Sequence, residues 1–174
     1  MTLFQQGGDA VNNEIQDLIE KHSSELSRLC TSLCVCRQDA EDLFQTTWEK
    51  VIKGYSKYDQ SRPFDKWLWS VCVNAYRDML RNPFRRYRMN FSTNEEMAET
   101  INSIPDAKGN IEDYIALHIA INKLEPKRRE VIALYYFRDF TYAEMSVILG
   151  IPEGTVKSRL NSAKEHLRKE LFDE

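Results

Sequence analysis

The chain has 174 residues, of which 42% are hydrophobic and 29% are charged, as expected for a folded protein of one or two small domains. No apolar run reaches the roughly 18–20 residues that a membrane span needs, and the N-terminus lacks a basic-then-apolar signal, so we expect a cytoplasmic protein. The four cysteines have neither a disulfide-framework nor a zinc-site spacing, which indicates buried free thiols rather than metal ligands or redox sensors.

The net charge of −3 is distributed unevenly along the chain. Residues 76–88 are strongly basic, whereas residues 89–114 are acidic. Local basic patches govern phosphate binding, so we expect a protein that binds DNA. Because the chain as a whole is acidic, we expect its affinity for DNA to be low when it acts alone.

Residues 1–13 are expected to be frayed, and a helix is predicted from Glu14 to Leu33, where apolar residues recur at helical spacing. A second helix follows, for which Asp39 is the predicted cap and Trp48 lies on the predicted buried side.

Residues 53–64 break this pattern and indicate a loop in which aromatic and basic side chains alternate, namely Tyr55, Lys57, Tyr58 and Arg62. Aromatic rings stack on flipped or single-stranded bases while cations hold the nucleic-acid backbone. The alternative is that Tyr55 and Tyr58 only pin the loop to the core.

The next predicted helix, residues 64–81, has a broad apolar face and an opposite polar strip formed by Asn74, Arg77, Asp78 and Arg81. Asparagine and arginine side chains suit contacts with base edges and phosphates. The alternative is a surface of ion pairs one helical turn apart, which stabilise a helix only weakly.

The periodicity is lost after Pro83, and residues 89–111 are predicted to be a flexible linker. The predicted fold is all-α, with two small helical domains at residues 14–88 and 112–174, because no stretch alternates like a strand. We find no glycine-rich phosphate loop, catalytic triad or paired-carboxylate site, so we predict no enzyme, no cofactor, no metal and no small-molecule substrate.

The clearest motif, residues 140–160, predicts two short helices joined by a tight turn. Thr141 and Glu144 have the spacing of a capping box, Gly150 lies where a left-handed residue ends a helix, and Pro152 begins the second helix. The predicted apolar side of the first helix comprises Ala143, Val147 and Ile148.

The second helix of this motif has a predicted buried stripe formed by Val156, Leu160, Ala163, Leu167 and Leu171. Turned away from it are the side chains of Lys157, Ser158, Asn161 and Ser162, with Arg159 at one edge. Such side chains donate to phosphates and base edges, so we interpret the motif as a helix-turn-helix that binds duplex DNA. The alternative is a helical hairpin that packs on the rest of the fold and leaves its basic residues solvated.

Taken together, these features resemble the extracytoplasmic-function (ECF) sigma factors of bacterial RNA polymerase. The resemblance covers residues 14–171 and is strongest in segments that follow one another in the family's order: DAEDLFQ at 39–45, FDKWLW at 64–69 with Asn74 and Arg81, LEPKRR at 124–129, and GTVKSRL at 154–160.

The resemblance implies an alternative sigma factor that binds core RNA polymerase and directs promoter recognition and strand opening, with region 2 at residues 14–88 and region 4 at 112–174. Contacts with the polymerase core would come from Asp39, Glu41, Asp42, Gln45 and Trp48. Contacts with the minus-10 element would come from Tyr55, Lys57, Tyr58, Arg62, Phe64, Asn74, Arg77 and Arg81. Contacts with the minus-35 element would come from Thr141, Thr155, Lys157, Ser158, Arg159, Asn161 and Ser162.

The partners implied by the resemblance are the β′ clamp and β flap of the core polymerase, promoter DNA as duplex and as single strand, and a membrane-bound anti-sigma factor. Two other interpretations stay open. A helix-turn-helix regulator that acts on duplex DNA without polymerase would have no need of residues 39–45 and the aromatic loop. An interaction protein that only titrates an anti-sigma factor would have no need of Asn74, Arg77 and Lys157.

Overall fold

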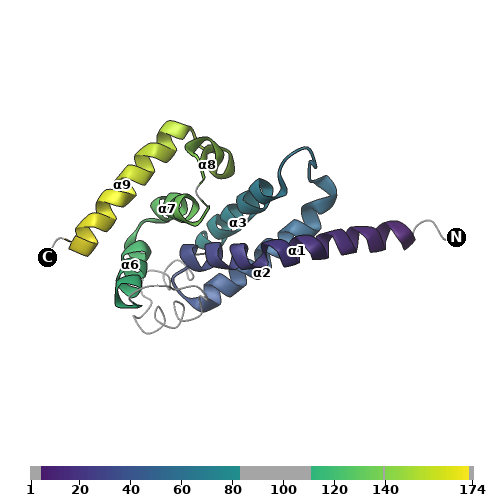
Figure 1. The fold of residues 1–174 in the computed structure, drawn as a ribbon, viewed down its shortest axis with the longest axis horizontal. Helices are drawn as coiled ribbons and strands as arrows, with labels where there is room; N and C mark the ends of the chain where they lie inside the picture. The colour runs from purple at the N-terminus through teal and green to yellow at the C-terminus, as the bar shows by residue number, and fades with distance from the viewer. Residues whose placement is uncertain (1–4, 83–110, 139, 173–174) are drawn as a thin grey trace.

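The computed structural model describes residues 5–82, 111–138 and 140–172, and every regular element in these ranges is a helix (Figure 1). The N-terminal half, residues 5–82, contains α1 (Gln5–Leu33), α2 (Arg37–Gly54), the short 3-10 helix η1 (Tyr55–Lys57) and α3 (Phe64–Leu80). The C-terminal half, residues 111–172, contains α6 (Ile111–Lys123), α7 (Pro126–Arg138), α8 (Tyr142–Leu149) and α9 (Glu153–Phe172). The predicted all-α fold is confirmed.

Two helix starts differ from the sequence prediction. α1 begins at Gln5, well before the predicted start at Glu14. α2 begins at Arg37 with Cys36 at its N-cap position, so the prediction that Asp39 caps this helix is wrong. Asp39 lies instead in the first turn, where a carboxylate faces the positive end of the helix, and it is fully buried.

The predicted linker at 89–111 lies outside the described residues, except for Ile111, which begins α6. The basic residues 85–88 also lie outside them. No helix in the described ranges is both long enough and apolar enough to cross a membrane.

The two halves pack against each other and share one hydrophobic core. In the N-terminal half α2 contacts both α1 and α3, and the side chains of Trp69 and Tyr76 are fully buried. In the C-terminal half α9 contacts α6, α7 and α8 around Leu134 and Leu160. Between the halves, α7 packs on α1 and α8 packs on α3, as Figure 1 shows.

A buried arginine of α7 lies at the junction of the halves. The Arg129 guanidinium donates hydrogen bonds to the carbonyls of Leu33 (3.1 Å), Leu124 (3.1 Å), Ile121 (3.3 Å) and Asn122. Leu33 ends α1, and the other three carbonyls lie at the C-terminal end of α6 or just after it. Because the last carbonyls of a helix have no partner within the helix, this one side chain satisfies groups from two helix ends.

Candidate nucleic-acid interface

The helix-turn-helix is held by the predicted capping box. The Thr141 hydroxyl accepts a hydrogen bond from the Glu144 backbone N–H (3.3 Å), and the Glu144 carboxylate accepts one from the Thr141 N–H (3.0 Å). The Glu144 carboxylate also accepts a hydrogen bond from the Thr141 hydroxyl (2.9 Å), and the bonds that it accepts from the Thr141 N–H and hydroxyl, with a smaller contribution from Lys66, hold the pKa of Glu144 below its usual range. Gly150 ends α8 in the left-handed conformation with φ of 65°, as predicted.

The buried face of α8 differs from the prediction. Met145, Ile148 and Leu149 are buried, whereas Val147 is 68% exposed and Ala143 is also exposed. The interpretation of Ala143 and Val147 as part of the apolar side is wrong, because apolar residues lie on both sides of this short helix and its contacts with α3 and α9 decide which face is buried.

The predicted sides of α9 are confirmed. Val156, Leu160, Ala163 and Leu167 are buried, and Leu171 packs against the core. On the opposite side Lys157, Ser158 and Asn161 are exposed, with Thr155, Arg159 and Ser162 partly exposed at its margins. This side therefore presents two cations, Lys157 and Arg159, with several hydrogen-bonding groups, a combination that can contact both phosphates and base edges.

The loop between η1 and α3 is folded over its own aromatic rings. Tyr58 stacks on Trp67 with ring centroids 4.6 Å apart, Phe64 lies edge-on to both rings, and Tyr55 is buried. Burial, together with the neighbouring Glu14 carboxylate, raises the pKa of Tyr55 to about 12. In this structure both tyrosines pin the loop to the core, while the side chains of Lys57 and Arg62 remain exposed.

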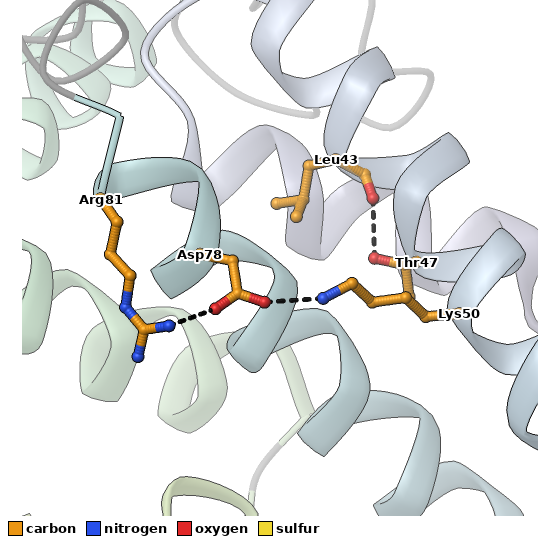
Figure 2. Close-up of polar contacts among 5 residues, drawn as sticks. All are labelled: Leu43, Thr47, Lys50, Asp78 and Arg81. Carbon is orange, nitrogen blue, oxygen red and sulfur yellow. Dashed lines mark hydrogen bonds and ion pairs between the residues drawn. The ribbon is translucent and has the colours of Figure 1, made fainter.

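The polar strip of α3 is divided by the packing of the two halves. Asn74 and Arg81 are exposed, and Asp78 accepts hydrogen bonds from Lys50 of α2 (2.7 Å) and from Arg81 (2.9 Å), as Figure 2 shows. The bond from Lys50 is the main cause that holds the pKa of Asp78 below its usual range. Arg77, by contrast, points into the contact with the C-terminal half, where it pairs with Glu130 of α7.

The residues predicted on α2 separate into an inner and an outer group. Asp39 and Trp48 are buried, and Asp39 accepts a hydrogen bond from the Cys36 thiol (3.3 Å). Glu41 and Gln45 are exposed and Asp42 is partly exposed. In this structure only the outer group offers a polar surface to a partner.

An apolar groove of about 520 Å³ lies between α6, α7 and α9. Three large hydrophobic side chains that remain exposed line it: Leu117, Tyr136 (60% exposed) and Phe172 (79% exposed). Lys164 and Arg168 also line the groove. No pattern in the sequence indicates this groove, because its residues come from separate helices.

Arg129 and Glu130 connect the halves, and neither was predicted to have a structural or functional role. The only local signal was a run of four charged residues, Lys127 to Glu130, directly before the apolar residues of α7.

The four cysteines are buried free thiols, as predicted. Burial raises the pKa of the Cys30 and Cys34 thiols well above the usual value, so these groups are poor nucleophiles. No group of His, Cys, Asp or Glu side chains in the described ranges could hold a metal ion.

Comparisons with known proteins match both halves. The family model described as Sigma-70 region 2 matches residues 18–86, and that described as Sigma-70, region 4 matches residues 114–167. The ECF RNA polymerase sigma factor SigL of Mycobacterium tuberculosis is 32% identical over 157 residues, which cover 87% of this chain and 85% of SigL. The ECF RNA polymerase sigma factor SigE of Mycolicibacterium smegmatis is 29% identical over 93% of this chain, which spans 63% of the length of SigE. The solved structure of the sigma factor RpoE of Bartonella quintana, in complex with the anti-sigma factor NepR, superposes with a TM-score of 0.70 and 26% identity over 91% of this chain and 99% of RpoE.

Proposed function

Because this chain belongs to the extracytoplasmic-function sigma factors of RNA polymerase, we propose that it is an alternative sigma factor that binds the polymerase core, recognises a promoter and stabilises the parted DNA strands. Such a factor acts by binding and is not an enzyme. We place its action in the cytoplasm, where the polymerase works. The observation that carries the proposal is the exposed polar side of α9, fixed by the capped turn within the segment that matches region 4.

In this proposal α9 enters the major groove of the minus-35 element. Lys157, Ser158 and Asn161 face the bases and phosphates, and Ser162 lies beside them. Arg159, Thr155 and Thr141 contact the flanking phosphates. The rigid capped turn fixes the angle at which α9 meets the duplex, which favours readout of base edges.

The minus-10 element is proposed to bind along α3 and the aromatic loop. Asn74, Arg81, Lys57 and Arg62 offer exposed donors for the DNA backbone and base edges. In the same loop, the partly exposed rings of Tyr58 and Phe64 are proposed to take an unstacked base, while the buried Tyr55 supports them from within. Binding parted strands more tightly than duplex would stabilise the open promoter without any chemical step.

The polymerase core is proposed to bind at two places. The outer side of α2, with Glu41, Asp42 and Gln45, meets the β′ clamp, while Asp39 and Trp48 support this helix from within. The groove between α6, α7 and α9 receives the β flap, because it brings the exposed apolar side chains of Leu117, Tyr136 and Phe172 together in one place.

Control by a membrane-bound anti-sigma factor is also proposed. RpoE, which has the same fold, was solved with the anti-sigma factor NepR bound. If the chain were recovered without any partner from cells in which its promoters are silent, this part of the proposal would be contradicted.

Run-off transcription with core polymerase tests the proposed function. We expect transcripts from the target promoter only when both the chain and the core are present. Lys157→Ala should lower the yield about tenfold, since a lost base or phosphate contact of 1–3 kcal/mol changes binding by roughly that factor. Lys169→Ala is the matched control, because it removes the same charge from α9 at an exposed position paired with Glu165. Equal transcription with and without the chain would instead favour a regulator that does not act as a sigma subunit.

A further inference from the structure

The contact between the two halves occupies Arg77, one of the side chains that the resemblance to sigma factors implies for contact with the minus-10 element. Arg77 of α3 donates two hydrogen bonds to the Glu130 carboxylate of α7, at 2.9 and 2.7 Å. A third bond joins Arg77 to the carbonyl of Leu149 at the end of α8 (3.2 Å). The Glu130 side chain is only 2% exposed and that of Arg77 is 32% exposed, so the pair is largely shielded from water.

The Glu130 carboxylate occupies the position that a phosphate would take on Arg77. A guanidinium presents parallel N–H groups that fit a carboxylate and a phosphate in the same two-bond geometry. The same donors cannot serve both anions at once. While the pair is intact, Arg77 is therefore unavailable to DNA.

Two further contacts hold the halves in the same arrangement. Lys66 of α3 pairs with Glu144 of α8 (3.2 Å), and Glu144 is also part of the capping box of the helix-turn-helix. Arg129, the neighbour of Glu130, donates to the carbonyl of Leu33 at the end of α1. The contact thus includes residues from both proposed DNA-binding elements.

We propose that Arg77 and Glu130 form a latch that closes the free chain, and that Arg77 exchanges Glu130 for a DNA phosphate when the halves separate. The exchange rests on the proposed function, because it takes α3 as a DNA-binding helix. Glu130 acts as a built-in competitor for the phosphate, so the apparent affinity for single-stranded DNA equals the affinity of the open chain multiplied by the fraction of chains that are open.

Charge reversal at Glu130 tests the latch. Glu130→Arg places a second cation against Arg77 and should open the chain. Opening is measured by carbodiimide cross-linking of Lys66 to Glu144, mapped by mass spectrometry, because this pair reports closure away from the mutated site. We expect the yield of this cross-link to fall about tenfold, and the affinity for a mixed-sequence single-stranded oligonucleotide, measured by fluorescence anisotropy, to rise by a similar factor.

Glu170→Arg is the matched control. It makes the same change of charge and breaks the pair of Glu170 with Lys123, but that pair joins α6 to α9 within the C-terminal half. The cross-link should persist in this variant, and any gain in DNA affinity that comes from net charge alone should appear in it. The double variant Arg77→Glu with Glu130→Arg restores an ion pair, so the cross-link should return while DNA binding stays weak.

Each outcome decides a separate part of the proposal. An unchanged cross-link yield in Glu130→Arg, or no recovery in the double variant, would overturn the latch. An opened Glu130→Arg chain that binds the oligonucleotide no better than Glu170→Arg would overturn the exchange. If no variant bound DNA although Glu130→Arg opened, the latch would be supported and the exchange would fail, while the proposed function would still be decided by run-off transcription with core polymerase.

Discussion

Arg129 is a buried cation that donates to backbone carbonyls from two helix ends. Arg129→Ala would remove the Arg129 donor from the carbonyls of Leu33, Asn122 and Leu124, whereas the Ile121 carbonyl keeps its bond from the Leu124 N–H. An unsatisfied buried polar group costs about 1–3 kcal/mol. We therefore expect the free energy of unfolding, measured by urea denaturation, to fall by about 3 kcal/mol or more.

The neighbouring arginine provides the control for this prediction. Arg128 is partly exposed, and its pair with Glu125 has an N–O distance of 4.0 Å. Arg128→Ala should change the free energy of unfolding by no more than about 0.5 kcal/mol. Equal losses in the two variants would show that the backbone carbonyls do not depend on Arg129.

Single residues also show what the sequence could and could not predict. The exposed row of α9 was predicted correctly, because helical spacing separates Lys157 and Asn161 from the buried stripe. Asp39 and Arg77 were both predicted to lie on the surface. Asp39 is buried, and Arg77 is partly covered by α7, where it pairs with Glu130. Charge and spacing place a side chain on a helix face, whereas tertiary packing decides whether that face meets water.

At the scale of the element, α8 shows that the spacing of apolar residues does not always predict which face of a helix is buried. Its ends were predictable, because Thr141 with Glu144 and Gly150 are local capping signals. Its buried face was not, because five of its eight residues are apolar: Ala143, Met145, Val147, Ile148 and Leu149. Apolar spacing selects a face only when polar residues occupy the other side.

The two faces of α8 predict opposite responses to substitution. Met145 is fully buried, so Met145→Ala should lower the free energy of unfolding by about 2–5 kcal/mol through lost burial and a cavity. Val147 is mostly exposed, so Val147→Lys should change it by less than about 0.5 kcal/mol. Urea denaturation of the two variants checks this assignment, and a large loss in Val147→Lys would contradict it.

At the scale of the whole molecule, the sequence predicted two helical domains in the right order but not their packing. Glu130 meets Arg77 and Arg129 meets Leu33, in both cases from a distant part of the chain. Local patterns carry no information about such pairs. The resemblance to sigma factors gave the order of the two regions and their proposed roles, but the closed arrangement came only from the structure.

The shared core predicts that the two halves unfold together. All three tryptophans, Trp48, Trp67 and Trp69, lie in the N-terminal half, so their fluorescence reports that half alone. Far-UV circular dichroism reports the helices of both halves. In urea the two signals should change at one midpoint for the natural chain, because α7 buries its apolar residues against α1.

Opening the latch should make the urea midpoints of these two signals differ. In Glu130→Arg the contact between the halves is weakened, so the fluorescence and circular dichroism midpoints should differ, whereas in Glu170→Arg they should stay together. Separate midpoints in the natural chain would show that the shared core contributes too little to couple the halves. A single midpoint in Glu130→Arg would show that the apolar contact of α7 with α1 couples them without the ion pair, because burial of apolar surface does not depend on charge.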